Sequence, residues 1–190
     1  MAKHFARRLL KIQDNINTDY VISGRYKFKI TNPKELARHI FEDVDPTFAS
    51  RIAKGDFLVA GENFGCGSSR EQAPQALKAS GIQAVIANSF ARIFYRNAFN
   101  IGLLLVEAET RHIIDGDELE IDMNASKLRD KSNGLLLDIK PIPKVMMSFL
   151  EFKFDQAHTW AIAGRNRSFS VSRGRAPAIS ASRSICPPHR

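Results

Sequence analysis

The hydrophobic positions of the chain fall into short runs that are separated by polar and glycine-rich segments. Three runs are almost continuously apolar, namely "FLVA" at 57–60, "IQAVIA" at 82–87 and "LLLVEA" at 103–108. Continuous runs of this length are typical of parallel strands that are buried on both faces. A shorter run at 9–12 predicts one more strand near the N-terminus.

Two segments with the apolar spacing of a helix lie between these runs, at 33–44 and at 89–102. Alternation of strands with helices predicts an α/β layer with largely parallel strand pairing. The apolar residues expected to form the buried faces of these two helices are Leu36, Ala37, Ile40, Phe41, Val44, Phe90, Ile93, Phe94 and Phe99.

A third helix is expected over 69–81, directly after a glycine-rich segment. Ser68 or Ser69 is the candidate N-cap, because a hydroxyl oxygen accepts a hydrogen bond from the first free backbone amides. Gly81 is the candidate C-terminal end, where a left-handed residue commonly closes a helix.

The pattern changes after residue 109. The segment "GDELEIDM" at 116–123 alternates apolar and acidic residues, and "GLLLDIKPIP" at 134–143 reads as a short strand that ends in prolines. The two are predicted to pair as a hairpin across 124–133. The sequence therefore predicts a mixed sheet and not a purely doubly wound fold.

The last part of the chain, 151–190, is rich in Arg, Ser and Pro and lacks periodicity, so it is predicted to be a disordered tail after a folded domain at 1–150. The net charge of +8 is concentrated there: six of the 28 basic residues and none of the 20 acidic residues lie in 165–190. The remainder has 22 basic and 20 acidic side chains, which argues against a nucleic-acid partner for the folded part. A tail that binds RNA or a membrane surface stays a weaker alternative.

No apolar run approaches the roughly 18 residues of a membrane span, and the N-terminus lacks the apolar core of a secretory signal. The two cysteines, Cys66 and Cys186, are far apart and form no paired metal motif, so we expect no metal site. These features favour a cytoplasmic protein.

The segment "GENFGCGSSREQAP" at 61–74 carries the chemistry. It matches neither a phosphate loop nor a dinucleotide fingerprint, and no histidine is placed beside Cys66 to make it a nucleophile. A glycine-rich turn followed by two hydroxyls and a guanidinium instead favours binding of a carboxylate by Ser68, Ser69 and Arg70. The alternative is that the serines only cap a helix and Arg70 is a solvated charge, and the residues alone leave both open.

Two segments, "DNINTDYVISGRY" at 14–26 and "DFLVAGENFGCGSSREQAPQALKASGIQAVIANSFARIFYRNAFNIGLLLVE" at 56–107, resemble the small subunits of 3-isopropylmalate dehydratase. These proteins correspond to the swivelling domain of the aconitase superfamily, and the resemblance covers roughly residues 8–145. It implies an α/β fold of three layers, β/β/α.

The resemblance also implies a hydro-lyase of leucine biosynthesis that moves a hydroxyl between adjacent carbons of a malate-type diacid. The family uses a [4Fe-4S] cluster, which needs three cysteine ligands that this chain cannot supply. The cluster is therefore expected on a separate large subunit, in a heterodimer or heterotetramer. The chain alone is expected to be inactive and to bind no cofactor.

Site residues follow from the resemblance position by position. Ser68 corresponds to the serine alkoxide that removes a proton from the substrate carbon, and Ser69 and Arg70 correspond to groups that bind the substrate carboxylate. Thr18 and Asp19 correspond to the motif that borders the active site and supports its hydrogen bonds. No catalytic role is implied for Cys66.

The segment "GRYKFKI" at 24–30 departs from the family pattern, because Phe28 occupies the place of an arginine that helps to select the substrate. Lys27 and Lys29 are candidates to restore a positive charge at this loop, although they could equally be exposed lysines. Isopropylmalate, homoaconitate and dimethylmalate remain candidate substrates. A relative that assembles without turnover is a further alternative.

Overall fold

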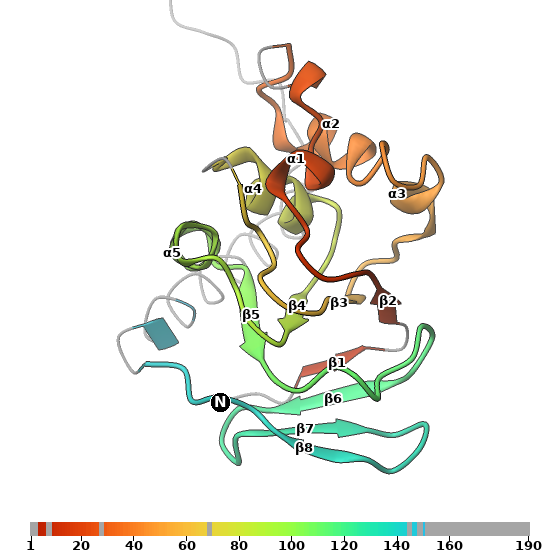
Figure 1. Ribbon diagram of the computed structural model, residues 1–190, viewed down its shortest axis with the longest axis vertical. Coiled ribbons are helices and arrows are strands. Elements are labelled where there is room, and N and C mark those ends of the chain that lie inside the picture. Colours follow the sequence, from red (N-terminus) through yellow and green to blue (C-terminus); the bar gives the residue numbers. More distant parts are fainter. Residues whose placement is uncertain are drawn as a thin grey trace, which may run out of the picture.

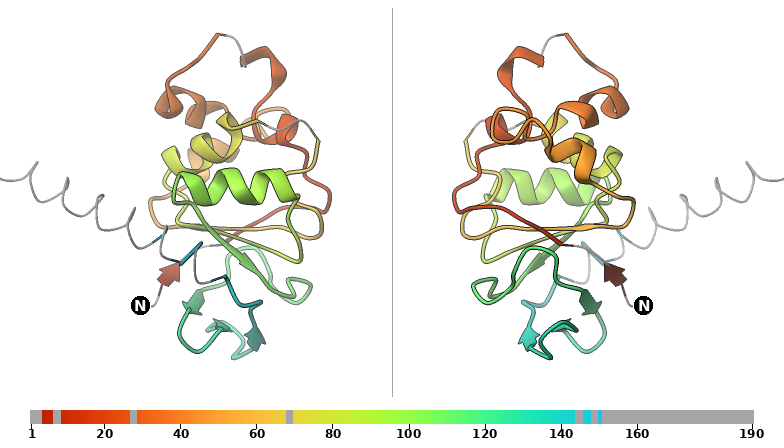
Figure 2. Two further views of the ribbon diagram at one scale, coloured as in Figure 1. Left: turned by 90° about the vertical axis from the view of Figure 1, so that its left-hand side faces the viewer. Right: turned by 90° about the vertical axis from the view of Figure 1, so that its right-hand side faces the viewer.

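The chain folds into three stacked layers (Figure 1). Helices form the first layer, a four-stranded parallel sheet forms the second, and a four-stranded antiparallel sheet forms the third. The side views show the same order, with the helices and the antiparallel strands on opposite sides of the parallel sheet (Figure 2). The predicted three-layer architecture is confirmed. The computed structural model describes residues 4–6, 9–26, 29–67, 70–143, 146–147 and 150, so the predicted tail lies outside the described residues.

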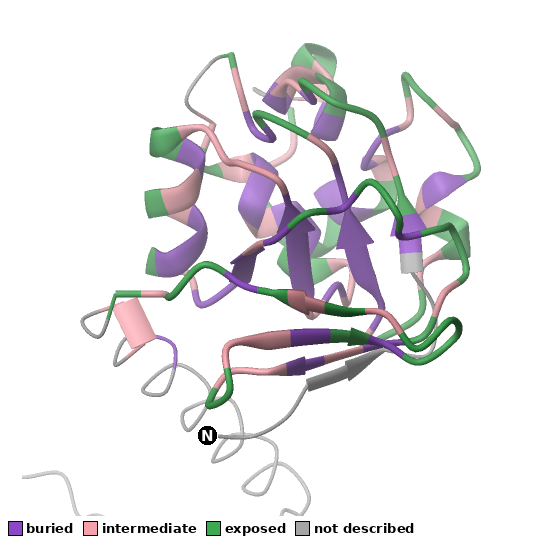
Figure 3. Cartoon of the chain, turned by 60° about the horizontal axis from the view of Figure 1, so that its bottom comes forward, coloured by how far each residue is buried: buried purple, intermediate pink, exposed green. Residues whose placement is uncertain are grey.

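The parallel sheet has the strand order β2-β3-β4-β5 and contains all of the predicted apolar runs. Leu10 lies opposite Leu58, and Leu58 lies opposite Val85 in the next strand. The central strands are buried completely, because helices cover one face and the antiparallel sheet covers the other (Figure 3). The four strands of the parallel sheet are β2 (Leu9–Lys11), β3 (Phe57–Val59), β4 (Ala84–Ala87) and β5 (Leu104–Glu107).

The antiparallel sheet has the strand order β1-β6-β7-β8. The predicted direct hairpin between 116–123 and 134–143 is wrong, because part of the intervening segment forms β7 and pairs with both neighbours. The prediction of parallel and antiparallel pairing in one domain is confirmed, with each kind in its own sheet. The strands are β1 (His4–Ala6), β6 (Leu119–Asp122), β7 (Lys127–Asp130) and β8 (Leu136–Asp138).

The helix predicted over 33–44 is shorter than expected. It consists of α2 and η2 and stops where Ile40 becomes extended and Phe41 takes a left-handed backbone conformation with φ +56°. Val44 is consequently exposed and not part of a buried helical face. Short helices also occur before it and after it. The bounds are α1 (Thr18–Val21), η1 (Gly24–Tyr26), α2 (Pro33–Leu36), η2 (Ala37–His39) and α3 (Phe48–Arg51).

Two longer helices, α4 (Gln72–Ala79) and α5 (Arg92–Asn100), connect the parallel strands. The N-cap of α4 is Glu71, which makes no capping bond, so the prediction of a serine N-cap is wrong. The helix ends at Ala79 with Ser80 as its C-cap, and the predicted terminating residue Gly81 follows with φ +102°. In α5 the predicted buried face is confirmed for Phe94 and Phe99 but not for Ile93, which is exposed.

A buried carboxyl group in β7 makes the stability of the fold depend on pH. Asp130 is fully buried, and its Oδ1 accepts a hydrogen bond from the amide of Ser132 at 2.9 Å. Among the described residues its Oδ2 has no hydrogen-bond partner. Burial, and after it the nearby carboxyl of Asp117, raises the pKa of Asp130. The folded state therefore holds this proton more tightly than the unfolded chain does.

Replacing Asp130 with asparagine is expected to stabilise the fold at neutral pH. A raised pKa contributes stability below the unfolded pKa, and this contribution is lost as the pH rises through the folded pKa. The neutral amide removes that loss, so the Tm should rise by roughly 2–6 °C at pH 8 and should change little near pH 4. Thermal unfolding across this range measures the effect.

Asp138→Asn is the matched control, because Asp138 lies in the neighbouring strand with an exposed side chain that pairs with Lys127. An increase in Tm at pH 8 that is equal in both variants, or that is absent in Asp130→Asn, would contradict the role assigned to the buried carboxyl.

Candidate active site

The two loops that carry the predicted site residues leave neighbouring strands at the same edge of the parallel sheet. Segment 12–19, whose last two residues begin α1, follows β2, and loop 60–71 follows β3; these two strands pair in register. Because ligands of open α/β sheets bind at the carboxyl ends of the strands, this is the expected place for a site. Backbone bonds join the loops from Asn15 N to Glu62 O (2.8 Å), Gly65 N to Ile16 O (2.8 Å) and Thr18 N to Cys66 O (3.0 Å).

The side chain of Asn17 fixes the end of the first loop against the second. Its Oδ1 accepts a hydrogen bond from the amide of Asp19 at 2.9 Å and so caps α1. Gly67 lies directly beside it with φ +84°, and a Cβ atom at this position would be 2.3 Å from Asn17 Oδ1. The loops approach this closely only because residue 67 has no side chain.

Arg70 is held at the end of the glycine-rich loop, and its side chain is 11% exposed. Its Nη2 forms an ion pair with Asp19, and its Nη1 donates a hydrogen bond to the carbonyl oxygen of Ile22 at 3.2 Å. Its Nε is buried and has no hydrogen-bond partner among the described residues. The guanidinium is therefore oriented by the first loop and is not the solvated surface charge that the sequence left open.

Of the predicted site residues, Thr18, Asp19 and Arg70 come together. Thr18 is buried, which suits a supporting position behind the site surface. The side chain of Asp19 is 45% exposed, and its Oδ1 is the atom paired with Arg70. Lys29 is exposed on the loop that follows η1. The candidates Lys27, Ser68 and Ser69 lie outside the described residues.

Cys66 packs within the paired loops. Its thiol donates a weak hydrogen bond to the carbonyl oxygen of Asn15 at 3.4 Å, and residue 66 forms a parallel bridge with Asn17. The contact is with backbone and not with a base, so it supports the packing role and gives no activated nucleophile.

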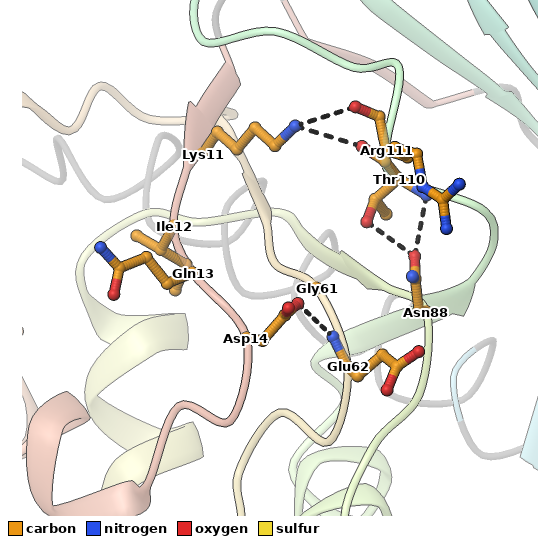
Figure 4. Close-up of a pocket in the computed structure, with 9 residues that line it drawn as sticks. All are labelled: Lys11, Ile12, Gln13, Asp14, Gly61, Glu62, Asn88, Thr110 and Arg111. Carbon is orange, nitrogen blue, oxygen red and sulfur yellow. Dashed lines mark hydrogen bonds between the residues drawn. The ribbon is translucent and has the colours of Figure 1, made fainter.

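A cleft of about 610 Å³ also opens at the carboxyl edge of the parallel sheet (Figure 4). Two of its charged side chains are already engaged: Lys11 Nζ donates to the carbonyl oxygens of Thr110 and Arg111, both at 3.3 Å, and Asp14 accepts from the amide of Glu62 at 2.8 Å. None of the predicted site residues lines it. The residues that line it are Lys11, Ile12, Gln13, Asp14, Gly61, Glu62, Asn88, Thr110 and Arg111.

Lys11 and Asn88 are structural residues that the sequence pattern did not reveal. The amide of Lys11 donates to Asp115 Oδ1 at 2.8 Å, and the side chain of Asn88 accepts from both the amide (2.8 Å) and the hydroxyl (2.7 Å) of Thr110. Together they fix the segment that leads from the parallel sheet to the antiparallel sheet. We therefore place the candidate site at Asp19 and Arg70 and not in this cleft.

Within the described part of the chain, no group of three or more His, Cys, Asp or Glu side chains is arranged to hold a metal ion. The helices described there include none that is long and apolar enough to cross a membrane.

Residues 2–111 match the model of the aconitase C-terminal domain family. This segment is more than half of the chain and contains the parallel sheet together with both site loops. The chain belongs to the aconitase C-terminal domain family.

Within this family, the chain is similar to small subunits of 3-isopropylmalate dehydratase. It is 54% identical to small subunit 1 of Archaeoglobus fulgidus over 145 residues, which is 76% of this chain and 89% of the relative. It is 50% identical over 144 residues to the methanogen homoaconitase small subunit of Methanothermobacter thermautotrophicus, with 76% of this chain and 84% of that protein covered. The crystal structure of 3-isopropylmalate dehydratase from Methanocaldococcus jannaschii superposes with a TM-score of 0.76 at 38% identity, covering 87% of this chain and all of that one.

Proposed function

We propose that this chain is the small subunit of a 3-isopropylmalate dehydratase, active in leucine biosynthesis as a complex with a large subunit. The observation that carries the proposal is the Arg70 guanidinium, which Asp19 and the Ile22 carbonyl hold at the end of the glycine-rich loop. Identities of about 50% to the dehydratase small subunits over three quarters of the chain support it.

In this proposal Arg70 binds a carboxylate of the malate-type substrate through its planar pair of N–H donors. Asp19 orients the guanidinium through its ion pair, and Ser69 adds a hydroxyl donor. Ser68, in its ionised form, accepts the proton from the substrate carbon. Positive charge beside a hydroxyl favours that ionised form, because opposite charges lower the pKa of an acid.

This chain does not fit an iron–sulfur cluster of its own. Such clusters are held by several cysteine thiolates, and the sequence contains only Cys66 and Cys186. We therefore assign the [4Fe-4S] cluster, which supplies a Lewis acid for the departing hydroxyl, to the large subunit. The residues of this chain then account for substrate binding and proton removal.

Reconstitution tests the function. The chain is co-expressed with the large subunit from the same genome under anaerobic conditions, and interconversion of 2- and 3-isopropylmalate is followed by chromatography. Activity is expected for the complex and for neither subunit alone. A complex that assembles but converts no malate-type acid would reject the proposed activity and identify a non-catalytic relative, and failure to assemble would reject the subunit role as well.

A homoaconitase small subunit is the second candidate, because a relative with that name is 50% identical. The sequence of loop 24–30 also favours this candidate, because it has lysines at 27 and 29 and no arginine at 28. A substrate with an additional carboxylate would suit two cationic side chains. Including homoaconitate and dimethylmalate in the same assay decides between the candidates by their kcat/KM values.

A further inference from the structure

Tyr26 is bound to the segment that follows α2 by a cluster of polar and aromatic contacts. Its hydroxyl donates to the carboxylate of Glu42, with distances of 2.8 Å to Oε2 and 3.0 Å to Oε1. Its ring stacks on that of His39, with centroids 4.1 Å apart. His39 Nδ1 lies 2.6 Å from Glu42 Oε2, so the carboxylate binds both rings at once.

The ionised form of Glu42 is the one that this arrangement stabilises. The hydrogen bond from His39, and then that from Tyr26, lowers the pKa of Glu42, and the same bond raises the pKa of the Tyr26 phenol. Arg25 contributes from the solvent side: its guanidinium pairs with Asp43 and lies over the Tyr26 ring, 5.3 Å from the centroid. The cluster thus combines charge-assisted bonds with stacking.

Tyr26 also controls the backbone of the loop in which the candidate substrate-binding lysines lie. Its carbonyl oxygen accepts hydrogen bonds from the amides of Lys29 and Ile30, each at 3.1 Å, and its own amide donates to Ser23 at 3.1 Å. The turn that carries Lys29 therefore begins at Tyr26. Because Lys29 and Ile30 are hydrogen-bonded to the Tyr26 carbonyl oxygen, contacts that fix the Tyr26 ring also fix the position of this turn.

The other side of the same segment rests on the candidate active site. Arg70 Nη1 donates to the carbonyl oxygen of Ile22. Residue Ile22 also forms an antiparallel bridge with Ile40. A Cβ atom on Gly24 would lie 3.9 Å from Arg70 Nη2, so the chain passes directly beside the guanidinium. Residues 22–26 thus lie between Arg70 and the segment that carries His39 and Glu42.

We infer that Glu42 and His39 are positioning residues for substrate selection: by holding Tyr26, they fix loop 24–30 beside Arg70. The inference rests on the proposed function, because it takes Arg70 as the carboxylate-binding group. Neither residue touches the substrate in this scheme. They set how far the Lys29 turn lies from the bound carboxylate, and hence which side chain of the acid is accommodated.

The test uses Tyr26→Phe and Glu42→Gln in the complex with the large subunit. Tyr26→Phe removes only the hydroxyl that Glu42 binds, and Glu42→Gln keeps the shape but removes the charge. The expected result is a KM for isopropylmalate raised about tenfold with kcat within about twofold. The preference for isopropylmalate over dimethylmalate should fall as well. A purely structural role would lower the amount of active complex and would leave KM and the preference unchanged.

Asp45→Asn is the matched control. Asp45 lies in the same segment and has a lowered pKa through its bonds to Thr47 and, less strongly, to Arg51, but its carboxylate contacts neither Tyr26 nor His39 in the described structure. Its KM and substrate preference should equal those of the unmodified complex.

Trypsin cleavage of the unbound chain after Lys29 gives a readout that is independent of activity. Both anchor variants should be cleaved faster than the unmodified chain and Asp45→Asn, because the turn is released. Unchanged cleavage overturns the inference, as does faster cleavage with unchanged KM and preference in an active complex. An unmodified complex that converts no acid rejects the proposed function, and the inference with it, whatever the cleavage shows.

Discussion

Replacing Ser68 with alanine is expected to lower the kcat of the reconstituted complex by roughly 10²–10⁴-fold, the usual contribution of a general base. The variant has no oxygen to accept the proton from the substrate carbon. Its KM should change by no more than about twofold, because Arg70 is the residue that binds the substrate carboxylate. Steady-state kinetics of the anaerobic complex measure both constants, and the melting temperature confirms that the loop fold is retained.

Cys66→Ala is the control for this experiment, because Cys66 lies two residues away in the same loop and the hydrogen bond of its thiol goes to the backbone of Asn15. It should retain kcat within about threefold, as expected for the loss of one small, partly buried thiol. Full activity of Ser68→Ala would remove the assigned base, and a large loss in Cys66→Ala would reopen the cysteine alternative.

The parallel layer could be predicted from the sequence because burial on both faces leaves a direct signal. The strands β3 and β4 and the first three residues of β5 are apolar without interruption. β7 gave no such signal, because its buried positions include Asp130, an acid in a place where the pattern calls for an apolar residue. The early end of the helix at Phe41 was equally hidden, since a left-handed residue with a bulky side chain is set by tertiary contacts.

The candidate site likewise has features that could be predicted from the sequence and features that could not. The glycine-rich segment could be singled out because its residue types are costly in a core, and the family resemblance gave roles to Ser68 and Arg70. The pairing of Arg70 with Asp19 could not be derived, because it depends on β2 and β3 being neighbours, which a one-dimensional pattern does not encode. Glu42 was missed for a related reason: His39 is a local partner three residues before it, but Tyr26 lies 16 residues away and reaches it only in the folded chain.

Gly65→Ala is expected to cost the fold at least about 3 kcal/mol, through strain and overpacking together. Gly65 has φ +80°, and a Cβ atom there would be 2.3 Å from Cγ and 2.5 Å from Cβ of Phe94. Phe94 cannot move away easily, because it is buried in α5 and packs edge-on against Phe64, with ring centroids 5.1 Å apart. Urea unfolding of the isolated chain measures the loss, and the complex should lose activity because loop 60–71 is displaced.

Gly134→Ala separates the two causes. Gly134 has nearly the same backbone conformation, φ +78°, but a Cβ atom there meets nothing within 4 Å. Its variant should lose only the cost of a left-handed alanine, about 1–2 kcal/mol. The difference between the two variants is then the contact with Phe94, which is what ties the glycine-rich loop to α5. Equal losses would mean that the loop yields to the added methyl group, and that its position next to Asn17 and Arg70 is set by backbone conformation alone.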